Sequence, residues 1–332
     1  MSFPLFDPVI CENGVIDSRP PIDAAAIDSA AGLLRAGQLV AFPTETVYGL
    51  GANALDAAAV ARIYSVKGRP ASSPLIVHVA SIEMAKALVE KWPEPAERLT
   101  RKFWPGPLTI VVEKKPAIPP IVTAGLPTVG LRMPNHPIAL ALIRAAGVPL
   151  AAPSANRFTQ LSPTTAAHVR AGLGSDVELI LDGGPCAVGI ESTVISLAGS
   201  RPALLRPGGL SRAEIESVIG PIVTASEISA GAHPSPGMHP RHYSPHARLI
   251  LVRNGELSFQ GEGAYLWREN PPSRPEIEAI RMPASAEDYA ASLFEALHRS
   301  DIPGRDWIAV ELPPAAPEWE AIHDRLRRAA SR

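Results

Sequence analysis

The chain has 332 residues, of which 46% are hydrophobic, and a formal net charge of −2 at pH 7. This length and composition can bury the core of a globular protein, with room for roughly two domains. The near-neutral charge argues against a nucleic-acid-binding protein, and no run of eighteen apolar residues could span a membrane.

Helical and strand-like spacings alternate from residue 22 to about residue 220. The first helix is expected at 22–36, where Gly37 supplies a stop before the strand 39–42. Further strands are expected at 74–80, 107–114, 129–134, 148–155, 177–184, 192–198 and 203–209. Further helices are expected at 57–67, 81–92, 136–147 and 163–173. The last two strands, joined through Gly199 and Ser200, are typical of a hairpin, so we predict an α/β domain with a mixed sheet.

A second pattern begins after a stretch rich in proline and histidine at 231–245. Strands are expected at 247–253, 263–267 and 307–312, and helices at 285–299 and 317–330. This alternation predicts a small three-layer α/β domain, and it contains no glycine fingerprint or metal-ligand spacing. We therefore divide the chain into a first domain at 1–220, a linker and lid at 221–246, and a small domain at 247–332.

The stretch "FPTETVYGLGAN", residues 42–53, places hydroxyl groups and glycines between apolar flanks. Turns that only connect two elements rarely need so many polar groups, whereas binding loops do. We expect its hydroxyls to line a small site and its glycines to turn the chain around it.

Lys67 and Arg69 lie two residues apart at the end of a predicted helix, with Gly68 between them. A mobile point charge next to a rigid guanidinium fork suits phosphate oxygens. The competing interpretation is a basic helix end that balances the helix dipole. The pair alone does not decide between these interpretations.

Two further polar groups follow apolar strands, where ligands bind in open α/β sheets. Ser154 and Asn156 end one strand, and Arg206 ends another beside Gly208 and Gly209. Ser162, before Pro163, is either an additional ligand contact or simply a helix N-cap. A glycine-rich loop at 182–190 could bring backbone N–H groups close to a ligand, but it is no Walker loop.

The remaining reactive side chains favour structural roles. The two cysteines, Cys11 and Cys186, show no paired spacing, and the sequence lacks a secretory leader, so we expect a cytoplasmic protein. Cys186 in a turn is more typical of a buried filler than of a nucleophile. Three histidines of the linker are interpreted as surface residues and not as zinc ligands, because prolines separate them and no cysteine joins them. They are His239, His242 and His246.

Seven segments in order carry a resemblance to the threonylcarbamoyl-AMP synthase family. They are "FPTETVYGLGAN", "KGRP…PLIVHV", "FWPGPLTIVV", "TVGLRMPNHP", "PLAAPSAN", "STVISL" and "LLRPG", and the linker "SPGMHPRHYSPHA" resembles that of the long members. The resemblance implies a twisted, mixed-sheet YrdC-like domain with a large cavity, followed by a small Rossmann-like domain. It also implies an enzyme, a nucleotidyltransferase, that forms threonylcarbamoyl-AMP and pyrophosphate from L-threonine, bicarbonate and ATP. The product would supply a tRNA threonylcarbamoyl transferase that modifies tRNAs reading ANN codons.

The same resemblance implies roles for individual residues. Lys67 and Arg69 would be the catalytic phosphate clamp, with Mg2+ bridging the phosphates and no metal site of the protein's own. The other ATP contacts would be Ser73, Thr128, Ser154, Asn156, Ser162, Arg206 and the lid residue Tyr243. The L-threonine contacts would be Thr44 or Thr46, His78, Arg132, Ala152 and Ser192. Arg132 would pair with the threonine carboxylate.

Two alternatives belong to other classes of protein. A domain of this fold could bind double-stranded RNA through a positive concave surface, so direct tRNA contact stays open, although the even charge balance argues against it. A carbamoyl-transfer or hydrogenase-maturation enzyme would add zinc-finger and acylphosphatase-like segments, and the sequence shows neither.

Overall fold

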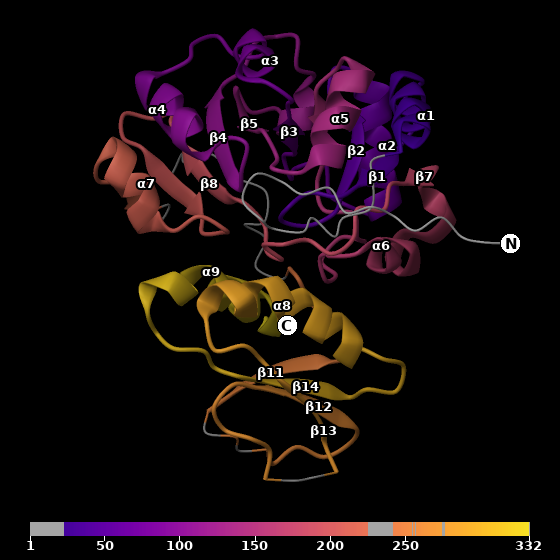
Figure 1. The fold of residues 1–332 in the computed structure, drawn as a ribbon, viewed down its shortest axis with the longest axis vertical. Helices are drawn as coiled ribbons and strands as arrows, with labels where there is room; N and C mark the ends of the chain where they lie inside the picture. The colour runs from indigo at the N-terminus through magenta and orange to yellow at the C-terminus, as the bar shows by residue number, and fades with distance from the viewer. Residues whose placement is uncertain (1–22, 225–241, 254, 256, 274–275, 332) are drawn as a thin grey trace, which may run out of the picture.

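The computed structural model describes residues 23–224, 242–253, 255, 257–273 and 276–331, which form two stacked α/β domains (Figure 1). The first domain contains a 10-stranded sheet with the order β10-β9-β8-β4-β5-β3-β6-β2-β1-β7. Its strands are β1 (Val40–Phe42), β2 (Gly49–Asn53), β3 (Ile76–His78), β4 (Leu108–Glu113), β5 (Thr128–Arg132), β6 (Leu150–Ala151), β7 (Leu179–Ile180), β8 (Thr193–Ser196), β9 (Ala203–Arg206) and β10 (Val223–Thr224). Its helices are α1 (Ala24–Arg35), α2 (Ala57–Lys67), α3 (Ile82–Ala87), α4 (Glu94–Phe103), α5 (Pro137–Ala146), α6 (Ala166–Leu173) and α7 (Arg212–Ile219).

The pairing of these strands confirms the predicted mixed sheet. β3 runs parallel to β5, whereas β4 runs antiparallel to β5. β8 and β9 pair antiparallel, which confirms the predicted hairpin. The edge strand β10 pairs with β9, so the sheet of the first domain extends beyond Gly220.

The glycines at the end of the opening stretch form a strand and not the expected turn. β2 pairs antiparallel with β1, with Gly51 opposite Val40. A Cβ atom at Gly51 would lie only 2.8 Å from the Phe42 ring, so a larger residue would collide with the ring. Glycine therefore serves close packing at this position, which the sequence pattern did not distinguish from a turn.

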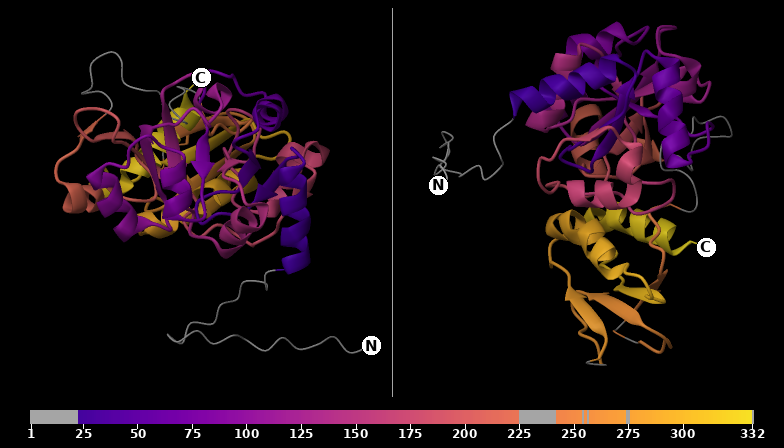
Figure 2. Two further views of the ribbon diagram at one scale, coloured as in Figure 1. Left: turned by 90° about the horizontal axis from the view of Figure 1, so that it is seen from above. Right: turned by 90° about the vertical axis from the view of Figure 1, so that its right-hand side faces the viewer.

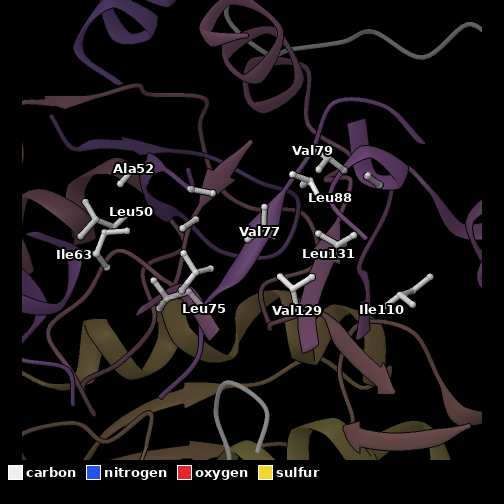
Figure 3. Close-up of a cluster of buried hydrophobic side chains, with 14 of the residues drawn as sticks. Leu50, Ala52, Ile63, Leu75, Val77, Val79, Leu88, Ile110, Val129 and Leu131 are labelled. Atoms are coloured by element: carbon white, nitrogen blue, oxygen red, sulfur yellow. The ribbon is translucent and has the colours of Figure 1, made fainter. Parts of the chain in front are cut away.

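The main core of the first domain lies between the sheet and the helices that cover it. Figure 3 shows side chains from β2, β3, β5 and α2 meeting in this cluster, including Leu50, Val77, Leu131 and Ile63. A second cluster packs α1 against α5. Because the central strands are buried among these side chains, the ends of β3, β5 and β6 have fixed positions.

Local signals explain where the helices begin and end. The carboxylates of Asp23 and Asp56 accept backbone N–H bonds at the starts of α1 and α2. Gly68 ends α2 in the left-handed conformation at φ +62°, as expected for a glycine after a helix. Helices α4 and α7 were not predicted, and α3 ends five residues before the predicted limit.

The second domain contains a four-stranded parallel sheet with the order β11-β14-β12-β13. Its elements are β11 (Arg248–Val252), β12 (Gly263–Trp267), β13 (Glu278–Arg281), α8 (Ala286–Ser300), β14 (Trp307–Glu311) and α9 (Glu320–Ala330). Both helices lie on the face of the sheet that is turned toward the first domain (Figures 1 and 2). The expected three-layer arrangement is therefore wrong, because the described residues cover the other face with connecting segments only.

The two domains share an apolar cluster. Val47, Leu161 and Ile190 of the first domain pack in one cluster with residues of α8, such as Leu293 and Phe294. The helices of the second domain are thus buried on both sides, by their own sheet and by the first domain. No helix among the described residues is long and apolar enough to cross a membrane.

Candidate active site

A small cavity of about 50 Å3 lies where the opening stretch meets the ends of β3, β5 and β6. Ten of the predicted site residues line it: Thr44, Thr46, Arg69, His78, Arg132, Ala152, Ser154, Ser192, Arg206 and Tyr243. The other five do not line it: Lys67, Ser73, Thr128, Asn156 and Ser162. The structure therefore brings together the expected threonine contacts and several of the expected nucleotide contacts.

The two threonines of the opening stretch differ in how their hydroxyl groups are used. The Thr44 hydroxyl donates to Val47 O at 2.7 Å and accepts the N–H groups of Thr46 and Val47, both at 3.2 Å. These bonds close a local turn. The Thr46 hydroxyl lies 2.9 Å from that of Thr44, and no other bond to it is described. Thr46 is thus the better placed of the two to contact a ligand.

The neighbouring strands β3 and β5 place His78 and Arg132 side by side, because these residues are partners in the parallel register. A terminal nitrogen of Arg132 lies 2.8 Å from a carboxylate oxygen of Glu45, and both side chains are buried. The Nε atom of Arg132 donates to Gly106 O at 3.3 Å. Burial and the nearby Arg132 charge lower the pKa of His78 to about 3, so this imidazole is neutral at physiological pH.

The two predicted phosphate-binding cations occupy different positions. Arg69 lines the cavity and donates to Pro74 O at 3.0 Å. Lys67 is buried behind it, where its ammonium group donates to the backbone oxygens of Ser154, at 2.5 Å, and Asn156. Burial, followed by the charge of Arg69, lowers the pKa of Lys67 well below its usual value. Lys67 therefore holds the Ser154 to Asn156 segment in place from behind the cavity.

Ser192 and Arg206 form the side of the cavity at β8 and β9. Arg206 donates from Nε and from a terminal nitrogen to Ser192 O, at 3.2 and 2.9 Å, and from the same terminal nitrogen to the Ser192 hydroxyl at 3.2 Å. That hydroxyl also lies 2.8 Å from the hydroxyl of Thr109. Burial lowers the pKa of Arg206. These bonds fix the guanidinium at the cavity wall.

Ser162 is not a helix N-cap, so that interpretation is wrong. Thr165 caps α6 by accepting His168 N–H at 3.3 Å. The Ser162 hydroxyl instead donates to the Glu191 carboxylate at 2.5 Å. Glu191 lines the cavity, and its other oxygen accepts Nε of Arg325 from the second domain at 2.6 Å.

The remaining predicted nucleotide contacts, Asn156, Ser73 and Thr128, do not belong to the lining of the cavity. Asn156 donates from its side-chain amide to Arg157 O and Gln160 O, at 2.9 and 2.8 Å. Ser73 O accepts the Tyr64 hydroxyl at 3.0 Å. Thr128 is buried at the start of β5, four residues before Arg132.

The end of the linker forms part of the cavity wall. His242 and Tyr243 both line it, and their rings meet edge to face with centroids 4.1 Å apart. The interpretation of His242 as a surface residue is wrong, because only 6% of it is exposed. Burial, then the charges of Arg69 and Lys67, lower its pKa well below the usual value. Tyr243 adopts φ +61°, a left-handed conformation that is rare for a residue with a side chain.

The other histidines and Cys186 stand apart from this chemistry. The His246 imidazole is exposed and lies 2.9 Å from the Asp301 carboxylate, and His239 falls outside the described residues. Cys186 is buried, and burial raises the pKa of its thiol to about 12, which suppresses the reactive thiolate. Among the described residues, no group of three or more His, Cys, Asp or Glu side chains could hold a metal ion.

Sequence reasoning missed four polar or charged residues at or beside the cavity. Glu45 and Glu191 pair with buried arginines, His242 lines the cavity, and Arg325 of the second domain contacts Glu191 in the cavity wall. Glu45 lies within the opening stretch, so its carboxylate between two threonines was a usable signal. The pairing of Glu191 with Arg325 spans 134 residues, and no local pattern indicates such a contact.

Comparisons with known proteins match both domains. The profile of the Sua5/YciO/YrdC family, described as "Telomere recombination", matches residues 32–208, and that of "Threonylcarbamoyl-AMP synthase, C-terminal domain" matches residues 210–331. The chain is 44% identical over 330 residues to the threonylcarbamoyl-AMP synthase of Pyrococcus abyssi, across 95% of this chain and 97% of that protein. It is 45% identical over 320 residues to the Bacillus subtilis synthase, across 92% of each.

A solved structure agrees with these matches. The crystal structure of Pyrococcus abyssi Sua5 complexed with L-threonine has a TM-score of 0.86 to this chain at 42% identity, covering 94% of this chain and 96% of that one. A profile match over more than half of the chain, two full-length relatives and this fold agree. The chain therefore belongs to the Sua5/YciO/YrdC family, in its two-domain form, as its motifs predicted.

Proposed function

We propose that this chain forms threonylcarbamoyl-AMP and pyrophosphate from L-threonine, bicarbonate and ATP in the cavity described above. One observation carries the proposal: one cavity is lined by three buried arginines, Arg69, Arg132 and Arg206, together with the hydroxyl groups of Thr46 and Ser192. The full-length relatives are threonylcarbamoyl-AMP synthases, and the Pyrococcus abyssi relative was crystallised with L-threonine. The tRNA modification that consumes the product belongs to the same proposal.

L-Threonine would occupy the part of the cavity nearest β3 and β5. The Arg132 guanidinium would receive its carboxylate in a charge-assisted, two-bond contact. Thr46, whose hydroxyl has spare bonding capacity, would contact the threonine hydroxyl, while neutral His78, Ala152 and Ser192 complete the pocket. Thr44 would contribute by shaping the turn.

ATP would occupy the part lined by Arg69, Ser154 and Arg206. Lys67 and Asn156 would keep that wall in position from behind, and Ser162 would do so through Glu191. Ser73 and Thr128 do not line the described cavity, so they would contact only a part of the nucleotide that extends beyond it. This division assigns direct phosphate contact to Arg69 and Arg206 and a supporting role to Lys67.

Mg2+ fits this site as a companion of the nucleotide and not as a resident metal. Both nearby carboxylates are engaged, Glu45 with Arg132 and Glu191 with Arg325, and the described residues contain no metal cluster. Mg2+ would supply charge neutralisation at the phosphates, and the phosphate oxygens themselves would hold it.

The reaction needs positioning more than covalent help from the protein. Bicarbonate takes up a proton and releases water to give CO2, and the threonine amine attacks the CO2 and gives up a proton, so the protons balance. The resulting N-carboxylate attacks the α-phosphorus of ATP as pyrophosphate leaves. Arg132 would fix one end of this nucleophile, while Arg69 and Arg206 would stabilise the charge that develops on the phosphates. Exclusion of water by Tyr243 would protect the labile product.

Substrate entry requires His242 and Tyr243 to withdraw. Ligand pockets for molecules of this size span roughly 300 to 1,000 Å3, far above the volume of the described cavity. The large cavity predicted from the family therefore stays a prediction for a conformation in which these two side chains have moved. They would act as the lid that was expected in the linker.

The proposed activity is tested by pyrophosphate release. We expect release from ATP and Mg2+ to require both L-threonine and bicarbonate and to stay low when either is omitted. Release that is equally fast without L-threonine would contradict the proposal. Titration of double-stranded RNA tests the alternative, because RNA binding would weaken steeply with salt whereas threonine-dependent turnover would not.

Substitution of the two threonines separates their roles. We expect Thr46→Val to raise KM for L-threonine about tenfold with little loss of stability, because it removes one hydrogen-bonding group from the pocket. Thr44→Val removes the bonds of the turn and should lower the free energy of unfolding by about 1–3 kcal/mol. Urea unfolding and threonine titration measure both. The opposite pattern would assign the threonine contact to Thr44.

A further inference from the structure

Arg325 of α9 is a fully buried cation whose side chain contacts the other domain. Its side chain is only 1% exposed, and its Nε atom lies 2.6 Å from the Glu191 carboxylate of the first domain. One terminal nitrogen donates to Pro207 O at 3.0 Å, again in the first domain, and to the neighbouring Asp324 at 2.7 Å. Because α9 lies on the side of the second domain that faces the first, docking of the second domain places this charge against the first domain (Figure 1).

The charge reaches the wall of the cavity through Glu191. This residue lines the cavity, and its second carboxylate oxygen accepts the Ser162 hydroxyl at 2.5 Å. The next residue, Ser192, accepts hydrogen bonds from the guanidinium of Arg206 through its backbone oxygen and its hydroxyl. Hydrogen bonds on both sides of the Glu191–Ser192 peptide bond therefore connect α9 with the part of the cavity assigned to the nucleotide.

Arg325 also supports the lid. Its guanidinium lies 5.1 Å from the centre of the Tyr243 ring, in cation–π geometry. Phe294 of α8 contacts the same ring with centroids 5.8 Å apart. The second domain thus holds Tyr243 through both of its helices, although the Tyr243 backbone is in a strained conformation.

Removal of the Arg325 charge would change which charged groups interact with Arg206. Two nearby charges act on Arg206 in opposite directions: the Arg325 cation lowers the pKa of Arg206, and the Glu191 carboxylate raises it. While Arg325 neutralises Glu191, Arg206 keeps its charge for a bound anion. Without Arg325, Glu191 would be a buried carboxylate that has lost its bonded cation, and its attraction for Arg206, which lines the same cavity, would compete with phosphate.

We infer that Arg325 is a positioning residue for the nucleotide: it neutralises Glu191, so that this carboxylate does not compete with phosphate for Arg206, and it holds Tyr243 over the cavity. This inference rests on the proposed function of the cavity and gives the second domain a part in it. ATP binding would then depend on docking of the second domain, whereas L-threonine binding at Arg132 would not.

Four variants of the full chain test this role: Arg325→Met, Arg325→Lys, the double variant R325M/E191Q, and Arg327→Met. Arg327 is an exposed arginine on the same helix and serves as the matched control. Calorimetry gives Kd for ATP with Mg2+ and, separately, for L-threonine, and pyrophosphate release gives KM and kcat.

We expect Arg325→Met to weaken ATP binding at least tenfold relative to Arg327→Met, with Kd for L-threonine changed less than about twofold. The double variant should bind ATP more tightly than Arg325→Met, because a glutamine at position 191 cannot neutralise Arg206. A merely structural role would lower the melting temperature without this difference between ligands and without rescue. If Arg325→Met does not fold, Arg325→Lys takes its place and should show a smaller loss confined to ATP.

An ATP Kd equal to that of Arg327→Met, or no rescue in the double variant, would overturn the inference. A wild-type chain that binds both ligands without releasing pyrophosphate would contradict the proposed function instead. The ATP affinities of the variants would still decide the role of Arg325 in that case.

Discussion

Arg132→Met should raise KM for L-threonine about 100-fold while KM for ATP changes less than about threefold. A charge-assisted pair in a buried site contributes roughly 2–5 kcal/mol, and each 1.4 kcal/mol corresponds to a factor of about ten. Arg132 lies at the end of β5 beside His78, in the part of the cavity where we place the amino acid. Pyrophosphate release at varied threonine and ATP concentrations measures the two values.

This substitution also leaves Glu45 buried without its cation, so its effect on stability must be separated from its effect on binding. We expect a loss of about 3–5 kcal/mol in the free energy of unfolding of Arg132→Met. Arg132→Lys keeps a cation near Glu45 but loses the planar fork, so it should retain more stability and still bind threonine poorly. The exposed Arg144→Met on α5 is the control. Equal increases in both KM values would contradict the assignment.

Arg69→Met should lower kcat/KM for ATP by about 10²–10³, the effect of removing one preorganised charged contact from a buried site. One terminal nitrogen of Arg69 is held by Pro74 O, and the side chain lines the cavity. Burial is the main cause that lowers the pKa of Arg69, to about 10, so the guanidinium is still protonated at neutral pH. The predicted loss is therefore that of a full positive charge.

Lys67→Met provides the comparison for Arg69. Because Lys67 holds two backbone oxygens behind the cavity wall, we expect this variant to lose stability together with activity, whereas Arg69→Met should unfold close to wild type. Lys91→Met, at an exposed lysine, controls for the loss of a charge. Arg69→Met with unchanged kcat/KM for ATP would place the phosphate contact on another residue.

Local patterns predicted most of the elements that build the site. Alternating apolar runs indicated β3, β5 and β9, and the ends of these strands carry His78, Arg132 and Arg206. Helix α2 was predicted at 57–67, and it ends at Lys67 as expected. Such signals depend on neighbours a few residues apart, which the sequence displays directly.

Contacts between distant segments escaped sequence analysis. β2 was interpreted as a turn because its glycines look permissive, whereas the Phe42 ring makes glycine necessary there. His242 looked like an exposed linker residue because its cover comes from other segments, including Phe158 at 5.9 Å between ring centres. The Lys67 ammonium group satisfies carbonyl groups 87 and 89 residues away, so its supporting role depends on the folded chain.

The left-handed backbone of Tyr243 would favour its departure from the cavity in the proposed reaction cycle. For a residue with a side chain, this conformation costs on the order of 1 kcal/mol, which corresponds to about a fivefold change in relative population. If Tyr243 leaves the cavity and returns to an ordinary backbone conformation, that cost is relieved. The open conformer, which can exchange products, is then more populated than the loss of the Tyr243 contacts alone would predict. The contacts of Arg325 and Phe294 with the tyrosine ring must therefore outweigh this backbone cost for the seated conformer to prevail.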